Sequence, residues 1–106
     1  MAKFLVAASY SAEGLRGLAK DKASGRKAAV EHVLASVGGK VDAIYFALGE
    51  SDVFLICDCP DTVSVAALGL TVSATGLVRT KTTALLTVEE VDKALGKMVS
   101  YRAPGA

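Results

Sequence analysis

Polar side chains that could bind a ligand gather near the ends of the apolar stretches of this chain. They are Ser9 and Tyr10, Asp58, and the basic pair Arg79 and Lys81. If the first and third strands run parallel at the centre of a sheet, their carboxyl ends meet at one edge, where the fourth strand enters. Such a cluster could orient an anionic or polar ligand. The alternative is an ion pair from Asp58 to Arg79 or Lys81 that satisfies a partly buried strand end.

The two cysteines and the single histidine are the other reactive side chains. Cys57 and Cys59 lie two residues apart in a strand pattern, so they share one face and cannot easily form a disulfide with each other. Because Val53 and Leu55 have the same parity, we expect both thiols to be reduced and buried in the core. His32 lies beside the apolar stripe of its helix, which predicts a surface position. The sequence therefore predicts neither a metal site nor a cofactor.

Composition narrows the class of protein. The chain has 106 residues, with 12 basic and 11 acidic side chains, which suits one globular domain without a strong electrostatic partner. The basic side chains Lys20, Lys22, Arg26 and Lys27 are diluted by Asp21 and fit a solvated helix end, so we expect no nucleic-acid binding. The apolar stretches are far shorter than the ~20 residues of a membrane-spanning helix. We expect no membrane association, no signal peptide and a cytoplasmic location.

The elements that must position these side chains follow from periodicity and turn residues. Thr87 and Glu90 form the Thr-x-x-Glu capping box of a last helix, whose Val88, Val91 and Leu95, followed by Met98 and Val99, are expected to face the core. Gly49 and Asp52 read as turn residues of a hairpin. We expect strands over residues 3–10, 40–48, 53–59 and 77–86, and helices over residues 12–22, 26–37, 61–74 and from 88 onward.

This order is β-α-β-β-α-β-α, with the segment 12–37 counted as one helical crossover. It predicts an α+β fold of ferredoxin-like βαββαβ type, with a four-stranded antiparallel sheet and an added C-terminal helix. We expect a single domain over residues 1–101 and a frayed tail over 102–106, where Pro104 and Gly105 lie.

Both faces of the expected sheet are apolar. Two helices cover only one face of a split βαβ sheet, and the other face is normally polar. Here Leu5 and Ala7 alternate with other apolar residues, and so do Ala43, Tyr45 and Ala47. The helix over 61–74 is also apolar nearly all round, which indicates a second contact surface or a deeply buried helix. We therefore expect a homo-oligomer formed through the open sheet face.

Several short motifs resemble one known family. They are Ala8–Gly14 (ASYSAEG), Gly38-Gly39-Lys40, Tyr45–Gly49 (YFALG), Pro60-Asp61 and Lys81-Thr82-Thr83. Together they resemble the GYD domain family, small bacterial proteins of unknown biochemical function, over about residues 3–93. The family is named for a Gly-Tyr-Asp signature. Here Gly49 and Asp52 remain, and Ser51 stands where tyrosine is expected. The resemblance implies a ferredoxin-like fold of the dimeric α/β-barrel kind and no established activity.

Two functions of different classes fit the sequence. The first is an oligomeric small-ligand-binding or regulatory protein, favoured because no phosphate loop, nucleophile elbow or paired-carboxylate motif is present. The alternative is a cofactor-independent enzyme of the dimeric α/β-barrel type. Its pocket would lie at the edge of the sheet, with Tyr10, Tyr45, Asp58 and Arg79 as polar groups. The sequence leaves open whether the protein is an enzyme.

Overall fold

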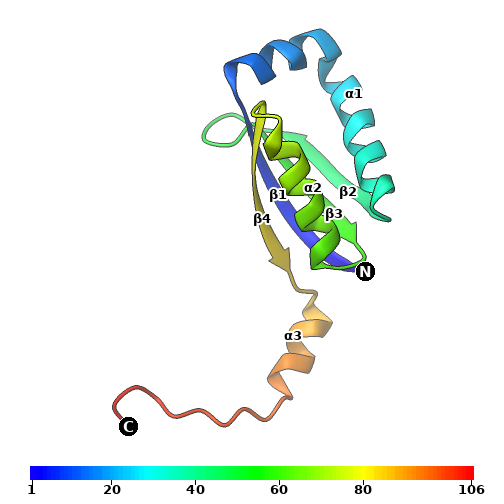
Figure 1. The fold of residues 1–106 in the computed structure, drawn as a ribbon. Coiled ribbons are helices and arrows are strands. Elements are labelled where there is room, and N and C mark those ends of the chain that lie inside the picture. The colour runs from blue at the N-terminus through cyan, green and yellow to red at the C-terminus, as the bar shows by residue number, and fades with distance from the viewer.

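The computed structural model describes all 106 residues and has one four-stranded sheet. Figure 1 shows two helical segments over one face of this sheet and a third helix beyond its end. The elements are β1 (Ala2–Tyr10), α1 (Ala12–Ser36), β2 (Lys40–Phe46), β3 (Val53–Cys59), α2 (Thr62–Ala74), β4 (Val78–Leu85) and α3 (Val88–Leu95). The order βαββαβα confirms the predicted ferredoxin-like architecture with an added C-terminal helix. None of the helices combines the length and apolarity needed to cross a membrane.

The strands lie in the order β2-β3-β1-β4, and every neighbouring pair is antiparallel. The expectation that β1 and β3 are parallel is therefore wrong. The crossover through α1 returns the chain to the starting end of β1, so β2 runs parallel to β1. The hairpin that follows then reverses the direction of β3. A β-bulge between Val41 and Ala43 interrupts the pairing of β2 with β3.

The first helix is held at its start by side-chain and backbone hydrogen bonds. Ser11 is the N-cap, and its Oγ accepts a hydrogen bond of 3.0 Å from the amide of Gly14. The amide of Ser11 donates to the carbonyl of Leu77 at 2.9 Å, which ties the helix start to the loop before β4. A Cβ atom at Gly14 would lie 2.2 Å from the same carbonyl oxygen, so only glycine permits this approach.

A kink at Lys22 divides α1 into two arms. Lys22 has φ 67° and ψ 163°, a combination that costs a non-glycine residue of order 1–3 kcal/mol. The break predicted between the helices over 12–22 and 26–37 thus exists, and it lies at the start of the expected gap. After the kink, the second arm runs along the sheet near β2 (Figure 1).

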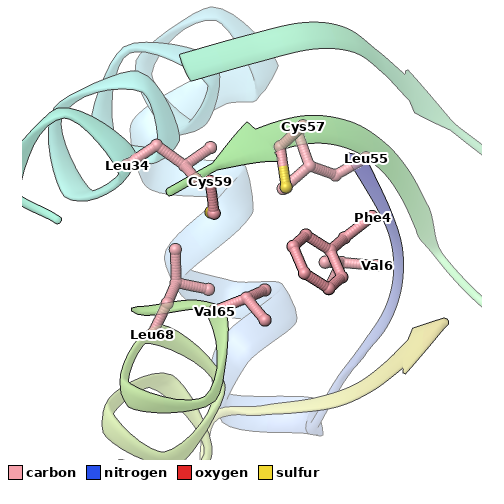
Figure 2. Packing of buried hydrophobic residues seen from close by; sticks show 8 residues of the cluster. All are labelled: Phe4, Val6, Leu34, Leu55, Cys57, Cys59, Val65 and Leu68. Atoms are coloured by element: carbon pink, nitrogen blue, oxygen red, sulfur yellow. The ribbon is translucent and has the colours of Figure 1, made fainter. Parts of the chain in front are cut away.

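The core lies between the sheet and the helices and is small. Figure 2 shows eight buried side chains from β1, β3 and both covering helices meeting there. Val65 and Leu68 of α2 are buried, whereas Val63 and Leu70 on its other side are exposed, so α2 is not deeply buried. The eight are Phe4, Val6, Leu34, Leu55, Cys57, Cys59, Val65 and Leu68.

The last helix begins as the sequence predicts but does not pack as expected. Thr87 and Glu90 form the predicted capping box, with hydrogen bonds of 2.8 and 3.1 Å. The inward orientation expected for its apolar side chains is wrong, because α3 extends away from the sheet (Figure 1). The exposed side chains of α3 and the segment after it are Val88, Val91, Leu95, Met98, Val99 and Tyr101.

The two free thiols give a first prediction. Cys57 and Cys59 are fully buried, as expected, and burial raises the pKa of both thiols, that of Cys57 to about 12. Since a thiol reagent attacks the thiolate, we expect both to react slowly in the native protein and rapidly in denaturant. Cys57→Ala should lower the free energy of unfolding by ~1 kcal/mol or more through lost packing. Fast native labelling of either thiol contradicts this.

The strained backbone at Lys22 gives a second prediction. Replacing Lys22 with glycine should raise the free energy of unfolding by about 1 kcal/mol, because glycine adopts this conformation without a Cβ clash. Lys20→Gly is the matched control, an exposed and regularly helical position of the same arm. It should lower the free energy of unfolding by about 1 kcal/mol. Urea unfolding at fixed protein concentration measures both, and equal effects of the two substitutions would argue against the kink.

Candidate functional site

An apolar cavity lies between the sheet and the second arm of α1, reaching α2 on its other side. Its volume is about 280 Å³, and 13 of its 15 lining residues are hydrophobic. Arg26 and Thr80 are the other two. Ligand pockets in proteins are typically concave, mostly apolar and supplied with few polar groups. The hydrophobic lining is Val6, Ala8, Tyr10, Ala29, Val30, Val33, Ile44, Phe46, Val53, Leu55, Leu68, Val72 and Val78.

The loop between β2 and β3 fixes Tyr10 at the end of β1 that borders this cavity. The amide of Tyr10 donates to Oδ2 of Asp52 at 2.8 Å, and the amide of Asp52 donates to the carbonyl of Ala8 at 2.8 Å. The carbonyl of Asp52 also accepts from the amide of Ala47 at 2.8 Å. Gly49 has φ 124°, which favours glycine. Gly49 and Asp52 thus serve the loop as predicted, and Asp52 holds the strand end of Tyr10.

Arg26 is the one charged residue that lines the cavity, so the solvated position expected for it is wrong. Its Nε is buried and has no hydrogen-bond partner. Its Nη1 lies 3.9 Å from Oδ2 of Asp21, at the limit of an ion pair. The sequence contained a sign that Arg26 faces the sheet. Arg26 precedes Val30 and Val33 at helical spacing and so occupies the apolar stripe of its arm. A charge on such a stripe marks a position where the apolar layer opens.

The structure brings three of the predicted site residues together, away from this cavity. Ser9, Arg79 and Lys81 line a depression of about 220 Å³ that also includes Glu50. Ser9 pairs with Arg79 in the sheet register, and its Oγ donates to the carbonyl of Glu50 at 3.2 Å. Arg79 and Lys81 alternate with the cavity-lining Val78 and Thr80, so this depression lies on the opposite, outer face of the sheet.

The other predicted site residues are dispersed. Tyr10 lines the inner cavity, while Tyr45 is exposed and neighbours Phe54 on the outer face. Asp58 pairs with Lys3, near the start of β1, whereas Ser9 and Tyr10 are at its end. The expected meeting of Asp58 with Ser9 and Tyr10 is therefore wrong, and the cause is the antiparallel pairing of β1 with β3.

Asp58 makes an ion pair, but not with the residues that the sequence suggested. Nζ of Lys3 lies 3.1 Å from Oδ1 of Asp58 and 2.9 Å from Oδ2 of Asp42. The hydrogen bond to Lys3 lowers the pKa of Asp42, and the bonds to Asp42 and Asp58 raise the pKa of Lys3. Asp58 therefore forms an ion pair with Lys3 at one end of the outer face, while Arg79 and Lys81 lie at the other end. The expected ion pair from Asp58 to Arg79 or Lys81 does not form.

No group of three or more His, Cys, Asp or Glu side chains is placed to hold a metal ion. His32 is exposed on α1, as predicted. The thiols of Cys57 and Cys59 point into the core beside Leu34 (Figure 2). The inner cavity, with Tyr10 and Arg26, is therefore the best-formed site for a small molecule, and its lining suits an apolar ligand.

One comparison with known proteins, the scan against family models, found a match. No curated protein and no solved structure matches the chain. The model of the GYD domain matches residues 4–95, which is most of the 106-residue chain. The match includes β1 from Phe4 onward, the sheet, both covering helices and all of α3. On this match, the chain belongs to the GYD domain family.

Proposed function

We propose that this protein is a homo-oligomer that binds a small molecule in the cavity between its sheet and its helices. The observation that carries the proposal is the cavity itself, about 280 Å³ of space with an almost wholly apolar lining. Tightly packed interiors contain few voids larger than a water molecule. A space of this size, next to an arginine whose buried Nε has no partner, is better explained by a ligand than by imperfect packing. A cytoplasmic location fits two free thiols.

Binding fits the cavity better than catalysis does. General acid–base chemistry most often uses histidine, aspartate or glutamate. The lining contains none of these, and its polar groups are the Tyr10 hydroxyl, the Thr80 hydroxyl and the Arg26 guanidinium. The alternative, a cofactor-independent enzyme, would have to use this small set with a substrate that supplies its own reactive group.

The exposed surface supports self-association. The chain exposes 7509 Å², whereas a compact monomer of 10.9 kDa exposes about 5,600 Å². The excess is more than twice the ~800 Å² that each partner buries in an ordinary stable interface. A second copy is the natural partner, because each copy carries the same unpartnered surfaces and the chain has almost no net charge to keep copies apart.

The outer face of the sheet is the best candidate for this interface. Its centre is apolar, with Leu5 and Ile56 half-buried and Phe54 and Tyr45 exposed. Charged side chains flank the centre, with the Lys3 ion pairs to Asp42 and Asp58 at one end and Arg79 and Lys81 at the other. A two-fold axis that brings two such faces together would bury the apolar centre of each copy and leave the charged side chains at the rim of the interface.

The C-terminal arm offers a second contact with the same partner. In α3 the side chains of Val88, Val91 and Leu95 recur at helical spacing, and all are exposed. A helix of eight residues has little stability in water without packing on its apolar side. We propose that α3 packs against the second copy when the sheets meet.

The dimer leads to a third prediction. Light scattering coupled to size exclusion at micromolar concentration should report a dimer or a multiple of it. Phe54→Lys should shift the protein toward monomer, because it places an unpaired charge in the centre of the buried face. Leu95→Lys should weaken the dimer less, since it affects the arm alone.

Val63→Lys is the matched control. Val63 is an exposed apolar residue of α2, on the opposite side of the molecule from the outer sheet face. This substitution should leave the mass of the particle unchanged. A wild-type monomer, or equal effects of Phe54→Lys and Val63→Lys, would contradict the proposed interface.

The cavity leads to a fourth prediction, which uses a neutral probe. 2-Naphthol should bind the wild-type protein and change its fluorescence on entering an apolar space. Ala29→Phe should weaken this binding at least about tenfold, because Ala29 lines the cavity and the added ring would fill part of it. Ala28→Phe is the matched control on the same helix, at a position outside the lining. Unchanged binding in Ala29→Phe would place the probe elsewhere and count against the cavity.

A further inference from the structure

The inner cavity has one cationic group, and that group lacks an adequate partner. Arg26 Nε is shielded from solvent and donates to no acceptor. The only carboxylate near its guanidinium is Asp21, with 3.9 Å between Nη1 and Oδ2 and a half-exposed side chain. A buried donor on a charged group that remains unpaired costs free energy, and such groups are rare in folded proteins. The guanidinium therefore retains the capacity to bind a planar anion through two parallel hydrogen bonds.

The rest of the cavity selects for an apolar body. Apart from Arg26, only Thr80 and the hydroxyl of Tyr10 add polar atoms to the lining. A ligand that carried charge or several hydroxyl groups away from Arg26 would lose hydration without gaining partners. The fitting molecule therefore has a single anionic end and an aliphatic or aromatic remainder.

The charges around the mouth indicate how many negative charges that end carries. A neighbouring depression shares Tyr10 and Arg26 with the cavity and is also lined by Glu13 and Asp21. Of these two carboxylates, Asp21 is the one that approaches the Arg26 guanidinium. One guanidinium with a carboxylate already beside it suits a monoanion and disfavours a phosphate dianion.

The cavity volume sets the size of the ligand. An apolar protein cavity of about 150 Å³ holds one benzene molecule. The cavity here, at about 280 Å³, is nearly twice as large. By this comparison it accommodates a body of about ten to twelve non-hydrogen atoms.

We propose that the ligand of this cavity is a small apolar monocarboxylate, a medium-chain fatty acid or an aromatic acid, with its carboxylate bound by Arg26. This inference rests on the proposed ligand-binding function and adds the chemical class. The kink at Lys22 starts the second arm of α1 only four residues before Arg26, so the guanidinium lies in the first turn of that arm. The positive end of the helix dipole there adds to the attraction for a carboxylate.

The test compares octanoate with octanamide, which has the same size and shape but no charge. Isothermal titration of the full-length protein should show that octanoate binds the wild type at least about tenfold more tightly than octanamide, as expected for a charge-assisted hydrogen bond. Arg26→Gln should remove that preference while leaving octanamide binding within about twofold. Arg26→Lys should retain part of the preference, because it keeps the charge but not the two-pronged geometry.

Arg16→Gln is the matched control, since Arg16 is an exposed arginine of the same helix that does not line the cavity. It should leave the preference unchanged. Equal binding of octanoate and octanamide to the wild type would overturn the assignment of a carboxylate while the binding of 2-naphthol still supported the cavity. A preference that survives in Arg26→Gln would overturn the role of Arg26. Failure of octanoate and of 2-naphthoate to bind at millimolar concentration would overturn the proposed class outright.

Discussion

The pairing of β1 with β3 on one side and with β4 on the other is the constraint on which the rest of this structure depends. Because β1 is central, its register decides which side chains of three strands face the helices. Phe4 and Val6 enter the core, and Ala8 and Tyr10 line the cavity. Lys3 and Ser9 then point to the outer face, one at each end of the strand. A slip of one residue would exchange these two sets and bury Lys3.

The sequence was sufficient to predict the helices and strands and their order, because these depend on local patterns of residues. Alternation and turn residues placed β3 at its observed bounds, and Thr87 caps its helix as expected. The chain direction of β3 relative to β1 is not a local property. It follows from the hairpin and the crossover taken together. Because the two strands were treated as parallel, the predicted position of Asp58 was at the wrong end of the sheet. The predicted site therefore combined residues from opposite ends.

The sequence also could not reveal what the apolar helix faces contact. Capping and spacing specify that Val88, Val91 and Leu95 share one side of α3, but they do not specify which surface covers that side. Within this chain no surface does. The same ambiguity concealed Arg26, which looked like part of a basic helix end until the fold placed the helix arm over the sheet. A side chain acquires a partner only when distant elements meet, and the pattern along one element does not contain that information.

The inner cavity and the kink at Lys22 belong to one arrangement. Each carries a cost, because apolar lining side chains such as Phe46 stay in contact with water while the cavity is empty, and Lys22 adds backbone strain. A straight helix from Ala12 would continue in the direction of its first arm, away from the line that the second arm follows along the sheet (Figure 1). The kink redirects the chain, so that Val30 and Val33 form the wall of the cavity and Arg26 its mouth. A bound carboxylate would offset both costs, since it fills the space and pairs the buried Nε of Arg26.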